Sequence, residues 1–347
     1  MAAPSTRNSI RDTAELEDLL SEPTEAVVQA LRSLGGDVII LGVAGKMGPT
    51  LARMVKRASE ISGASRRVIG VARFSSAKPQ QQLQAWGIET LQYDLLDRDS
   101  LAKLPDAANV VYMAGMKFGA TGQEPLTWAM NSFLPGLVCE RYRHSRMAIF
   151  STGNIYGLSP VSRGGSREED APAPVGEYAM SCLGRERICE QFSQKHHTKM
   201  SLLRLNYATE LRYGVLVDIA QRVYAQQPVP LSMGYLNAIW QADASAMSLQ
   251  ALACASDPPL VINIAGPELL SVRHTAEEFG KRWHKPVHFT GTESEDALLS
   301  NGQKAYQLFG RPTVSAEEII TWIADWVERG GETWDKPTHF EERAGRF

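Results

Sequence analysis

The stretch that decides the fold is Asp37-Val-Ile-Ile-Leu-Gly42-Val-Ala-Gly45-Lys-Met-Gly48, an apolar run that leads straight into three glycines. An apolar run without alternation predicts a strand that is buried on both faces. Residues 47–60, which follow, have the apolar spacing of an amphipathic helix. Because glycine tolerates tight turns, we predict a strand, a close turn and a helix in direct succession.

The same alternation of apolar runs and amphipathic segments continues to about residue 207. Further strand-like runs lie at 67–72, 89–94, 109–115, 147–152 and 200–205. Strands that are apolar throughout and are separated by helices are typical of a parallel sheet covered by helices on both faces. We therefore predict an α/β fold, a doubly wound parallel sheet with a smaller C-terminal α/β domain.

The pattern divides the chain into four parts. We expect a helical N-terminal extension over 1–35, the sheet domain over 36–207, a smaller domain mainly within 208–330 and a polar tail over 331–347. Short segments from beyond residue 207 are expected to join the sheet domain. A serine N-cap and a Gly-Gly stop bound a final helix within 315–331. Its Trp322 and Trp326 stand one turn apart and are expected in the core.

Composition excludes several classes of partner. The 347 residues carry 36 basic and 39 acidic side chains, and the net charge of −3 argues against binding nucleic acid or an anionic membrane by bulk charge. No run approaches the roughly 18 apolar residues of a membrane span. Cysteines at 139, 182, 189 and 254 are too sparse for a disulfide scaffold and indicate a reducing, cytoplasmic location. His196-His197 lacks a third ligand nearby, so no metal site is expected.

The glycine turn predicts a dinucleotide site. It follows the first strand and precedes a helix, which is the context in which a pyrophosphate rests on a helix N-terminus. The second strand would normally end in a carboxylate for the ribose hydroxyls, but Arg73 and Ser75 stand there and Lys46 lies in the glycine loop. These residues suit a 2′-phosphate, which favours NADP over NAD. The alternative is that Arg73 and Lys46 are ordinary surface charges.

Several motifs together resemble the extended short-chain dehydrogenase/reductases. They are the glycine turn, Tyr93-Asp94-Leu95, Met113-Ala114-Gly115, Asn131, Ser151-Thr152-Gly-Asn-Ile-Tyr156-Gly157, Tyr178, Trp240-Gln-Ala-Asp243 and Asn263-Ile-Ala-Gly266. More narrowly, residues 37–330 resemble the NAD-dependent epimerase/dehydratase family, and residues 114–117 are similar to the equivalent stretch of UDP-glucose 4-epimerase. The resemblance implies a Rossmann fold and hydride transfer with NADP or NAD.

The resemblance also implies roles for particular residues. The pyrophosphate would lie on Gly42, Gly45, Met47 and Gly48, the adenine beside Asp94 and Leu95, and the ribose and nicotinamide near Ala114, Gly115, Lys117, Asn131 and Tyr178. Thr152 and Tyr178 match the catalytic pair, in which the tyrosine takes the proton of a substrate hydroxyl and the threonine orients that oxygen. Family members often pair through the helices that here span about 125–144 and 178–194, so a homodimer is expected.

One position departs from the family pattern. The family has Tyr-x-x-x-Lys, whereas this chain reads Tyr178-Ala-Met-Ser-Cys182. A lysine one helical turn after the tyrosine would lower the pKa of the phenol, and a neutral thiol does not. Lys117 could supply the missing charge, Tyr178 could act as a neutral acid or be replaced by another base, or catalysis could be lost. Cys182 is a candidate catalytic thiol, with a small apolar filler as the plainer interpretation.

The C-terminal half bears on the substrate. Nucleotide-sugar members of the family generally place arginines there for the diphosphate, but this chain has Leu236 and Asn237 where one is expected. We therefore expect an NAD(P)-dependent oxidoreductase or epimerase acting on a hydroxyl-bearing carbon of a small sugar, sugar acid or polyol. The alternatives are a nucleotide-sugar epimerase/dehydratase and a dinucleotide-binding relative without catalysis.

Overall fold

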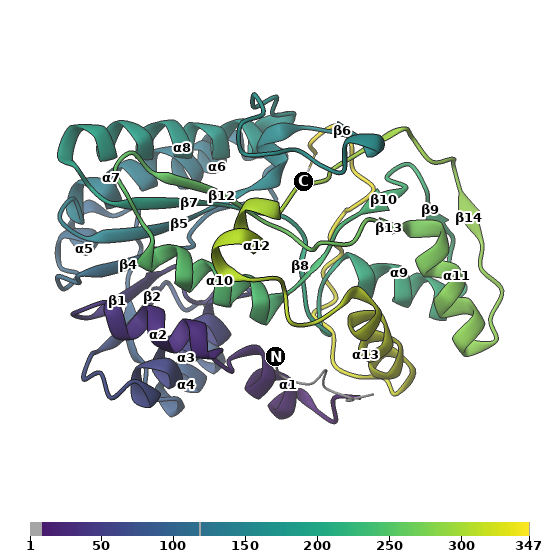
Figure 1. The fold of residues 1–347 in the computed structure, drawn as a ribbon, viewed down its shortest axis with the longest axis horizontal. Coiled ribbons are helices and arrows are strands. Elements are labelled where there is room, and N and C mark those ends of the chain that lie inside the picture. The colour runs from purple at the N-terminus through teal and green to yellow at the C-terminus, as the bar shows by residue number, and fades with distance from the viewer. Residues whose placement is uncertain (1–8, 118, 347) are drawn as a thin grey trace.

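The predicted strands assemble into one parallel sheet in the computed structural model, which describes residues 9–117 and 119–346. Within these residues the sheet has seven strands in the order β3-β2-β1-β4-β5-β7-β12 (Figure 1). The strands are β1 Val38–Leu41, β2 Val68–Ala72, β3 Glu89–Gln92, β4 Asn109–Tyr112, β5 Arg146–Thr152, β7 Met200–Leu205 and β12 Leu260–Ile264. Strand β1 is buried along its whole length between β2 and β4. The doubly wound α/β fold is thereby confirmed, and the burial explains the unbroken apolar runs.

The last strand of the sheet comes from far along the chain. Strand β12 pairs in parallel with β7, so that Ile262 lies beside Leu203. A segment more than fifty residues beyond residue 207 therefore completes the edge of the sheet.

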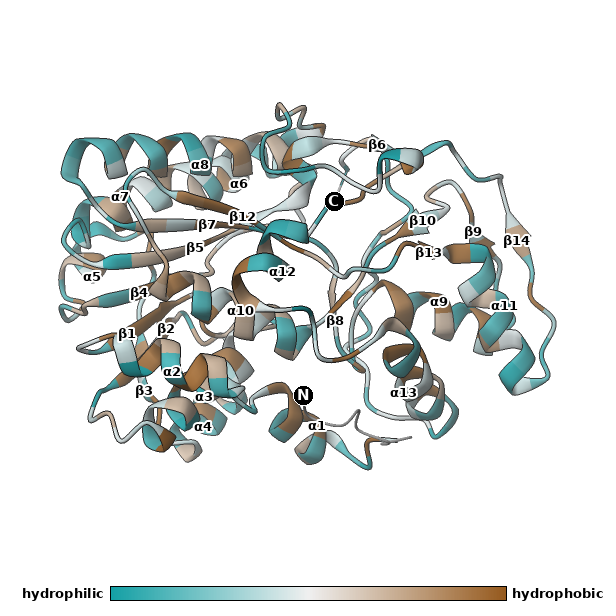
Figure 2. Cartoon of the chain, viewed as in Figure 1, coloured by the Kyte–Doolittle hydropathy of each residue, from teal (hydrophilic) through white to brown (hydrophobic). Residues whose placement is uncertain are grey.

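Helices cover both faces of the sheet (Figure 1). One face packs against α2 Glu25–Ser33, α3 Gly48–Ile61, α4 Ala77–Ala85, α10 Gln241–Ala253 and α12 Gln303–Phe309. The other packs against α5 Arg98–Ala102, α7 Leu134–Arg141 and α8 Gly176–His196, with α6 Glu124–Trp128 and a π-helical turn, Ala129–Phe133, leading into α7. Figure 2 shows the outward turns of α8 as hydrophilic, as expected for a helix with one face in the core.

A second core lies beyond the end of the sheet. It is built by α9 Val215–Tyr224, α11 Val272–Trp283 and α13 Ala316–Glu328. Short strand pairs join these helices: β8 Ala208–Thr209 with β11 Ile239–Trp240, β9 Val229–Pro230 with β14 Phe289–Thr290, β10 Tyr235–Leu236 with β13 Leu270–Ser271, and β6 Ser159–Pro160 with β15 Asp296–Ala297. Trp322 and Trp326 are buried in this core, as predicted. The predicted N-cap of α13 is also confirmed, because Ser315 and Glu318 form a reciprocal capping box.

The two ends of the chain tie these regions together. In the N-terminal extension, α1 Thr13–Leu20 buries Leu16 and Leu20 in the second core, while α2 buries Leu31 against the sheet. The C-terminal tail has no regular structure in its described part but is held by polar contacts. The Thr338 N–H donates to Asp218 at 2.7 Å. The tail thus runs beside the start of α9, where the site described below is found.

Candidate active site

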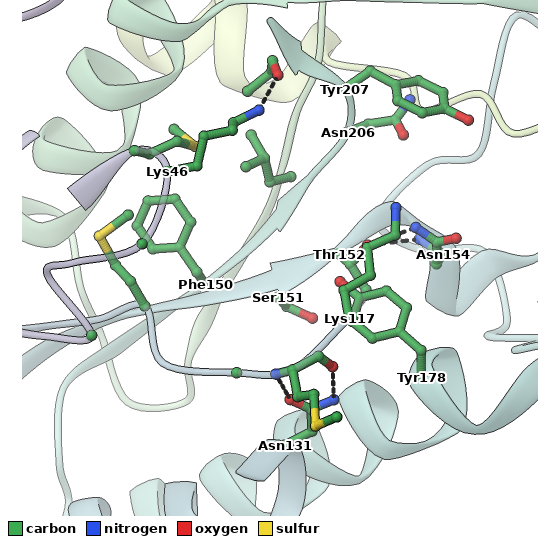
Figure 3. Close-up of a pocket in the computed structure, with 18 of the residues that line it drawn as sticks. Lys46, Lys117, Asn131, Phe150, Ser151, Thr152, Asn154, Tyr178, Asn206 and Tyr207 are labelled. Atoms are coloured by element: carbon green, nitrogen blue, oxygen red, sulfur yellow. Dashed lines mark hydrogen bonds between the residues drawn. The ribbon is translucent and has the colours of Figure 1, made fainter. Parts of the chain in front are cut away.

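A cavity of about 300 Å³ opens at the carboxyl ends of β1, β4, β5 and β7. This end of an open α/β sheet is where ligands bind. The described residues that line it are Gly42, Gly45, Lys46, Met47, Met113, Ala114, Gly115, Met116, Lys117, Asn131, Phe150, Ser151, Thr152, Asn154, Tyr178, Arg185, Leu205, Asn206, Tyr207, Ala208, Tyr213, Gly214, Val215 and Thr338. The cavity therefore brings together most residues that the sequence predicts for the site, several of which are labelled in Figure 3. Thr338 of the C-terminal tail also lines it.

The glycine turn lets a ligand approach the backbone. Gly42 has φ of +90°, and a Cβ there would lie 2.7 Å from the backbone nitrogen of Ala114, at the end of the neighbouring strand β4. Helix α3 begins at Gly48 and has no side-chain N-cap. The uncapped helix end and the cations that line the cavity suit the negative charge of a pyrophosphate. The turn therefore fits the dinucleotide that the sequence predicts.

Gly42→Ala is expected to cost NAD⁺ affinity at least about tenfold, equal to about 1.4 kcal/mol, because the methyl group forces β1 and β4 apart. Gly63→Ala is the matched control, since Gly63 also has positive φ, +70°, but a Cβ there meets nothing within 4 Å. The control should lose only about 1–2 kcal/mol of stability and no affinity. Calorimetric titration with NAD⁺ and thermal melting measure both. Equal affinity losses in the two variants would contradict the assignment of the turn.

Two hydroxyl groups meet at one end of the cavity, as the resemblance implies. Thr152 ends β5, and its Oγ1 accepts hydrogen bonds from the Asn154 backbone N–H at 3.2 Å and side-chain Nδ2 at 2.9 Å. Tyr178 reaches the same place from the first turns of α8 (Figure 3). Burial raises the pKa of Tyr178, and a hydrogen bond from Thr152 works in the opposite direction. Thr152 and Tyr178 therefore place two hydroxyl groups together in the wall of the cavity.

Cys182 lies behind Tyr178 rather than in the cavity. It is 1% exposed and packs with Ile155, Tyr156 and Leu183. Burial raises the pKa of its thiol, which keeps the sulfur neutral. A neutral thiol that does not line the cavity matches the description of a small apolar filler better than that of a nucleophile.

Two lysines reach into the cavity from opposite sides. Lys117 follows β4, and its Nζ lies 5.7 Å from the centre of the Tyr178 ring. Lys46 extends from the glycine turn, donates to the Ala208 carbonyl at 2.8 Å and lies 4.0 Å over the Tyr213 ring. Burial lowers the pKa of Lys46 to about 7 and that of Lys117 to about 8. Lys46 thus contacts the segment after β7, and the structure does not group it with Arg73 and Ser75.

The residues predicted for the adenosine half lie outside this cavity. Arg73, Ser75 and Asp94 are exposed on the surface beyond β2 and β3, and Leu95 is buried in the core. Asp94 accepts a hydrogen bond from the Leu96 N–H at 3.0 Å, which fixes the turn after β3. The phosphate and nicotinamide ends of the predicted site therefore share one cavity, while its adenosine end is open surface.

Asn131 and Arg185 support the loop that carries Lys117. Asn131 is fully buried, and its amide exchanges two hydrogen bonds of 2.8 Å with the backbone of Met116. Arg185 bonds Asn131 in turn and lines the cavity. Sequence reasoning missed Arg185, although it stands seven residues after Tyr178 and so on the same face of α8. That spacing is the signal by which it could have been found.

The positions expected to hold a substrate arginine do not face the cavity. Leu236 is 1% exposed within the second core. The Asn237 amide donates to the carbonyls of Gly266 at 2.9 Å and Ser300 at 2.7 Å. Leu236 therefore packs in the second core, and Asn237 is used in hydrogen bonds within the protein.

The described residues also bear on metal binding and on membrane insertion. Within 9–117 and 119–346, no cluster of three or more His, Cys, Asp or Glu side chains is arranged to hold a metal ion. His197 instead pairs with Asp257 at 2.8 Å. The helices of the described part include none that is both long and apolar enough to span a membrane.

Comparison with solved structures gives the same fold. A UDP-glucuronic acid 4-epimerase from Bacillus cereus in complex with NAD is 19% identical with a TM-score of 0.70, over 84% of this chain and 97% of that one. A UDP-glucose 4-epimerase from Thermotoga maritima with UDP-glucose is 17% identical with a TM-score of 0.69, over 85% and 99%. A dTDP-glucose 4,6-dehydratase from Bacillus anthracis in complex with NAD is 15% identical with a TM-score of 0.71, over 85% and 97%.

One protein-family model matches part of this chain. No curated protein matches this chain. Residues 38–209, which run from β1 to β8 and include every strand of the large sheet except β12, match the NAD dependent epimerase/dehydratase family. That match covers the glycine turn, Thr152 and Tyr178. Residues 38–209 of this chain are therefore similar to the NAD dependent epimerase/dehydratase family.

Proposed function

We propose that this chain is an NAD-dependent enzyme that epimerises or dehydrates a nucleotide-linked sugar. The observation that carries the proposal is the meeting of the Thr152 and Tyr178 hydroxyl groups in a cavity that begins at the glycine turn. The structural neighbours add support, since they include enzymes of UDP-glucuronic acid, UDP-glucose and dTDP-glucose. The family match, the site geometry and these neighbours thus favour a nucleotide sugar over the smaller substrate that the missing arginine at Leu236 and Asn237 suggests.

Each residue of the site has a separate role in the proposed proton transfer. Gly42, Gly45 and Met47 at the glycine turn would hold NAD, which would supply a reversible hydride acceptor for the substrate carbon. Tyr178 acts in its phenolate form: it takes the proton from the hydroxyl on that carbon and becomes a neutral phenol, while Thr152 orients the same oxygen. Lys117, on the loop after β4, adds positive charge close to the Tyr178 ring. Asn131 keeps that loop in position through its bonds to Met116.

One observation favours a smaller polyhydroxylated substrate as the second candidate. Thr338 of the C-terminal tail lines the cavity, and its backbone and hydroxyl are held by Asp218. The tail therefore occupies space beside the start of α9, and Asn237 is already bonded within the protein. A sugar acid or polyol would need less room than a nucleotide sugar.

A substrate panel separates these functions. The purified protein with NAD⁺ is incubated with UDP- and dTDP-linked hexoses and hexuronic acids and, separately, with free sugars, sugar acids and polyols. Products are followed by mass spectrometry and proton NMR, because epimerisation leaves the mass and the net redox state unchanged. Turnover of nucleotide sugars supports the proposal, and turnover of free sugars alone supports the second candidate. Cofactor binding without turnover on any substrate would favour a non-catalytic protein.

The proposal includes a preference for NAD. The NADP interpretation grouped Lys46 with Arg73 and Ser75, but Lys46 is engaged at Ala208 instead. The surface charge of Arg73 is the remaining support for NADP. Titration with NAD⁺ and NADP⁺ decides the preference, and Arg73→Ala should leave NAD⁺ affinity within about twofold. Tighter binding of NADP⁺ by the unaltered protein would contradict it.

The affinity for NAD⁺ is expected to fall about tenfold as the pH rises from about 6 to 9. Both cavity lysines have lowered pKa values, about 7 and about 8, so they are charged below this window and neutral above it. A diphosphate anion is attracted by the charged forms, so the loss occurs on the alkaline side. Calorimetric titration at each pH measures the effect. Lys46→Met and Lys117→Met should flatten the profile, and an unchanged profile in both would refute this origin.

We also propose that the chain forms a homodimer through the face shared by α6, the π-helical turn and α8. Large apolar side chains are unusually exposed there: Leu126, Trp128, Phe133 and Met180. Phe133 is 49% exposed, which is costly unless a partner covers it. Light scattering after size exclusion should give twice the chain mass, and Phe133→Glu should give the monomer. A monomeric unaltered protein at micromolar concentration would contradict the dimer.

A further inference from the structure

Arg185 is a buried cation that lines the cavity and is held rigidly. Its side chain is 5% exposed. Its Nε donates to the Asn131 carbonyl at 3.1 Å, Nη2 to the Asn131 Oδ1 at 3.0 Å and Nη1 to the Phe150 carbonyl at 2.5 Å. These bonds join α8 to the π-helical turn and to β5. The guanidinium is therefore fixed in the lining of the cavity, between the π-helical turn and β5.

The charge of Arg185 is not balanced by a carboxylate among the described residues. Its hydrogen-bond partners there are amide and carbonyl oxygens, and the described lining of the cavity contains no Asp or Glu. By contrast, the buried Arg204 pairs with Glu186 at 2.8 Å. A buried charge is costly without a counter-charge. The Tyr112 ring, 5.5 Å from the guanidinium carbon, offers a partial complement. A full counter-charge would come from a ligand or from a side chain in the cavity that loses a proton.

Arg185 also lies where a cation would act on the tyrosine. Tyr178, Cys182 and Arg185 follow one another on one side of α8, one and then two turns along. A Cβ on Gly115 would lie 2.7 Å from the Arg185 Nη2, so the guanidinium sits directly against the loop after β4. The positive charge of Arg185 opposes the rise that burial causes in the pKa of Tyr178.

We propose that Arg185 is a positioning residue that supplies the fixed positive charge which the family resemblance assigns to a lysine at position 182. The inference rests on the proposed function for its cofactor. A guanidinium has five N–H groups, and the bonds shown use one on each nitrogen, so the side chain is fixed by three bonds while its charge remains available to the site. Unlike Lys117, an arginine stays charged across the working pH range.

The test moves the charge between the two positions. Calorimetric titration with NAD⁺ compares the unaltered protein with Arg185→Gln, Cys182→Lys and the double variant. Arg185→Gln should weaken binding at least about tenfold, and the added lysine should restore most of that loss in the double variant. Cys182→Lys alone should bring no gain, because two cations then share one site. A tenfold gain from Cys182→Lys alone, or no loss from Arg185→Gln, would overturn the proposal.

A second measurement needs no cofactor. In urea unfolding, Cys182→Lys should lower the midpoint more in the protein with Arg185 than in the Arg185→Gln variant, because like charges repel. If the midpoint shifts of the two single variants simply add in the double variant, positions 182 and 185 do not share one site, and the proposal is overturned. If the unaltered protein binds no NAD⁺, the proposed function fails, while the urea cycle still judges Arg185.

If Arg185→Gln does not fold, Arg185→Lys is tested in its place. This variant keeps the charge but loses the fork of hydrogen bonds. It should keep NAD⁺ affinity within about threefold of the unaltered protein. A folded Arg185→Lys variant that loses affinity tenfold or more would show that the hydrogen-bonding shape matters and the charge does not.

Discussion

Tyr178→Phe is expected to lower kcat by about 10²–10⁴-fold on whichever substrate the panel identifies. The change removes the phenolic oxygen that takes the substrate proton and keeps the ring that packs beside Cys182. The affinity for NAD⁺ should stay within about threefold, because the cofactor cradle at the glycine turn is untouched. Steady-state kinetics and calorimetric titration on the same preparation measure the two quantities separately.

Tyr156→Phe is the matched control for that experiment. Tyr156 belongs to the same small cluster, but its hydroxyl donates to Asn263 at 2.8 Å and accepts from Arg204 at 2.6 Å, and it does not line the cavity. The control should lose about 1–2 kcal/mol of stability and keep kcat within about threefold. If Tyr178→Phe retains more than a tenth of the activity, another group must move the proton.

Glu186→Gln is expected to lower the free energy of unfolding by about 3–5 kcal/mol. The Glu186 carboxylate is fully buried and pairs with Arg204, which is itself buried on β7. Ser151 on β5 donates a further hydrogen bond of 2.5 Å to the same carboxylate. Glutamine would keep the volume but leave the Arg204 charge unpaired in the interior. Urea titration followed by tryptophan fluorescence measures the loss.

Glu190→Gln on the same helix provides the comparison. Glu190 pairs with Arg187 at 2.8 Å, but these side chains are 28% and 55% exposed, so water screens the pair. The expected loss is at most about 0.5 kcal/mol. Similar losses in both variants would mean that the pair between Glu186 and Arg204 does not hold α8 against the sheet.

The strands could be predicted because their evidence is local. Runs such as 67–72 and 200–205 are mostly apolar, and each became a strand within a residue of its expected start. The serine cap of α13 and the burial of its tryptophans follow from the same short-range rules. Strand β12 was not placed in advance, because its pairing with β7 depends on where a segment some sixty residues later returns to the sheet.

The site could be predicted in part. Thr152 and Tyr178 were expected together, and the cavity contains both. The direction of Lys46 could not be foreseen, since its acceptor is a carbonyl 162 residues away. Arg185 escaped notice for the opposite reason. It stands close to Tyr178 in sequence, but a mid-helix arginine is ordinarily a solvated one.

The sequence by itself determined the alternation of strands and helices, the glycine turn and the departure from the family at Cys182, because these depend on residue type and on spacing along the chain. The tertiary structure decided which charges share the cavity. Helix α8 packs with Arg185 against β5 and the π-helical turn, and the segment after β7 meets Lys46. Electrostatic effects depend on distance through space and on burial, which spacing along the chain does not fix.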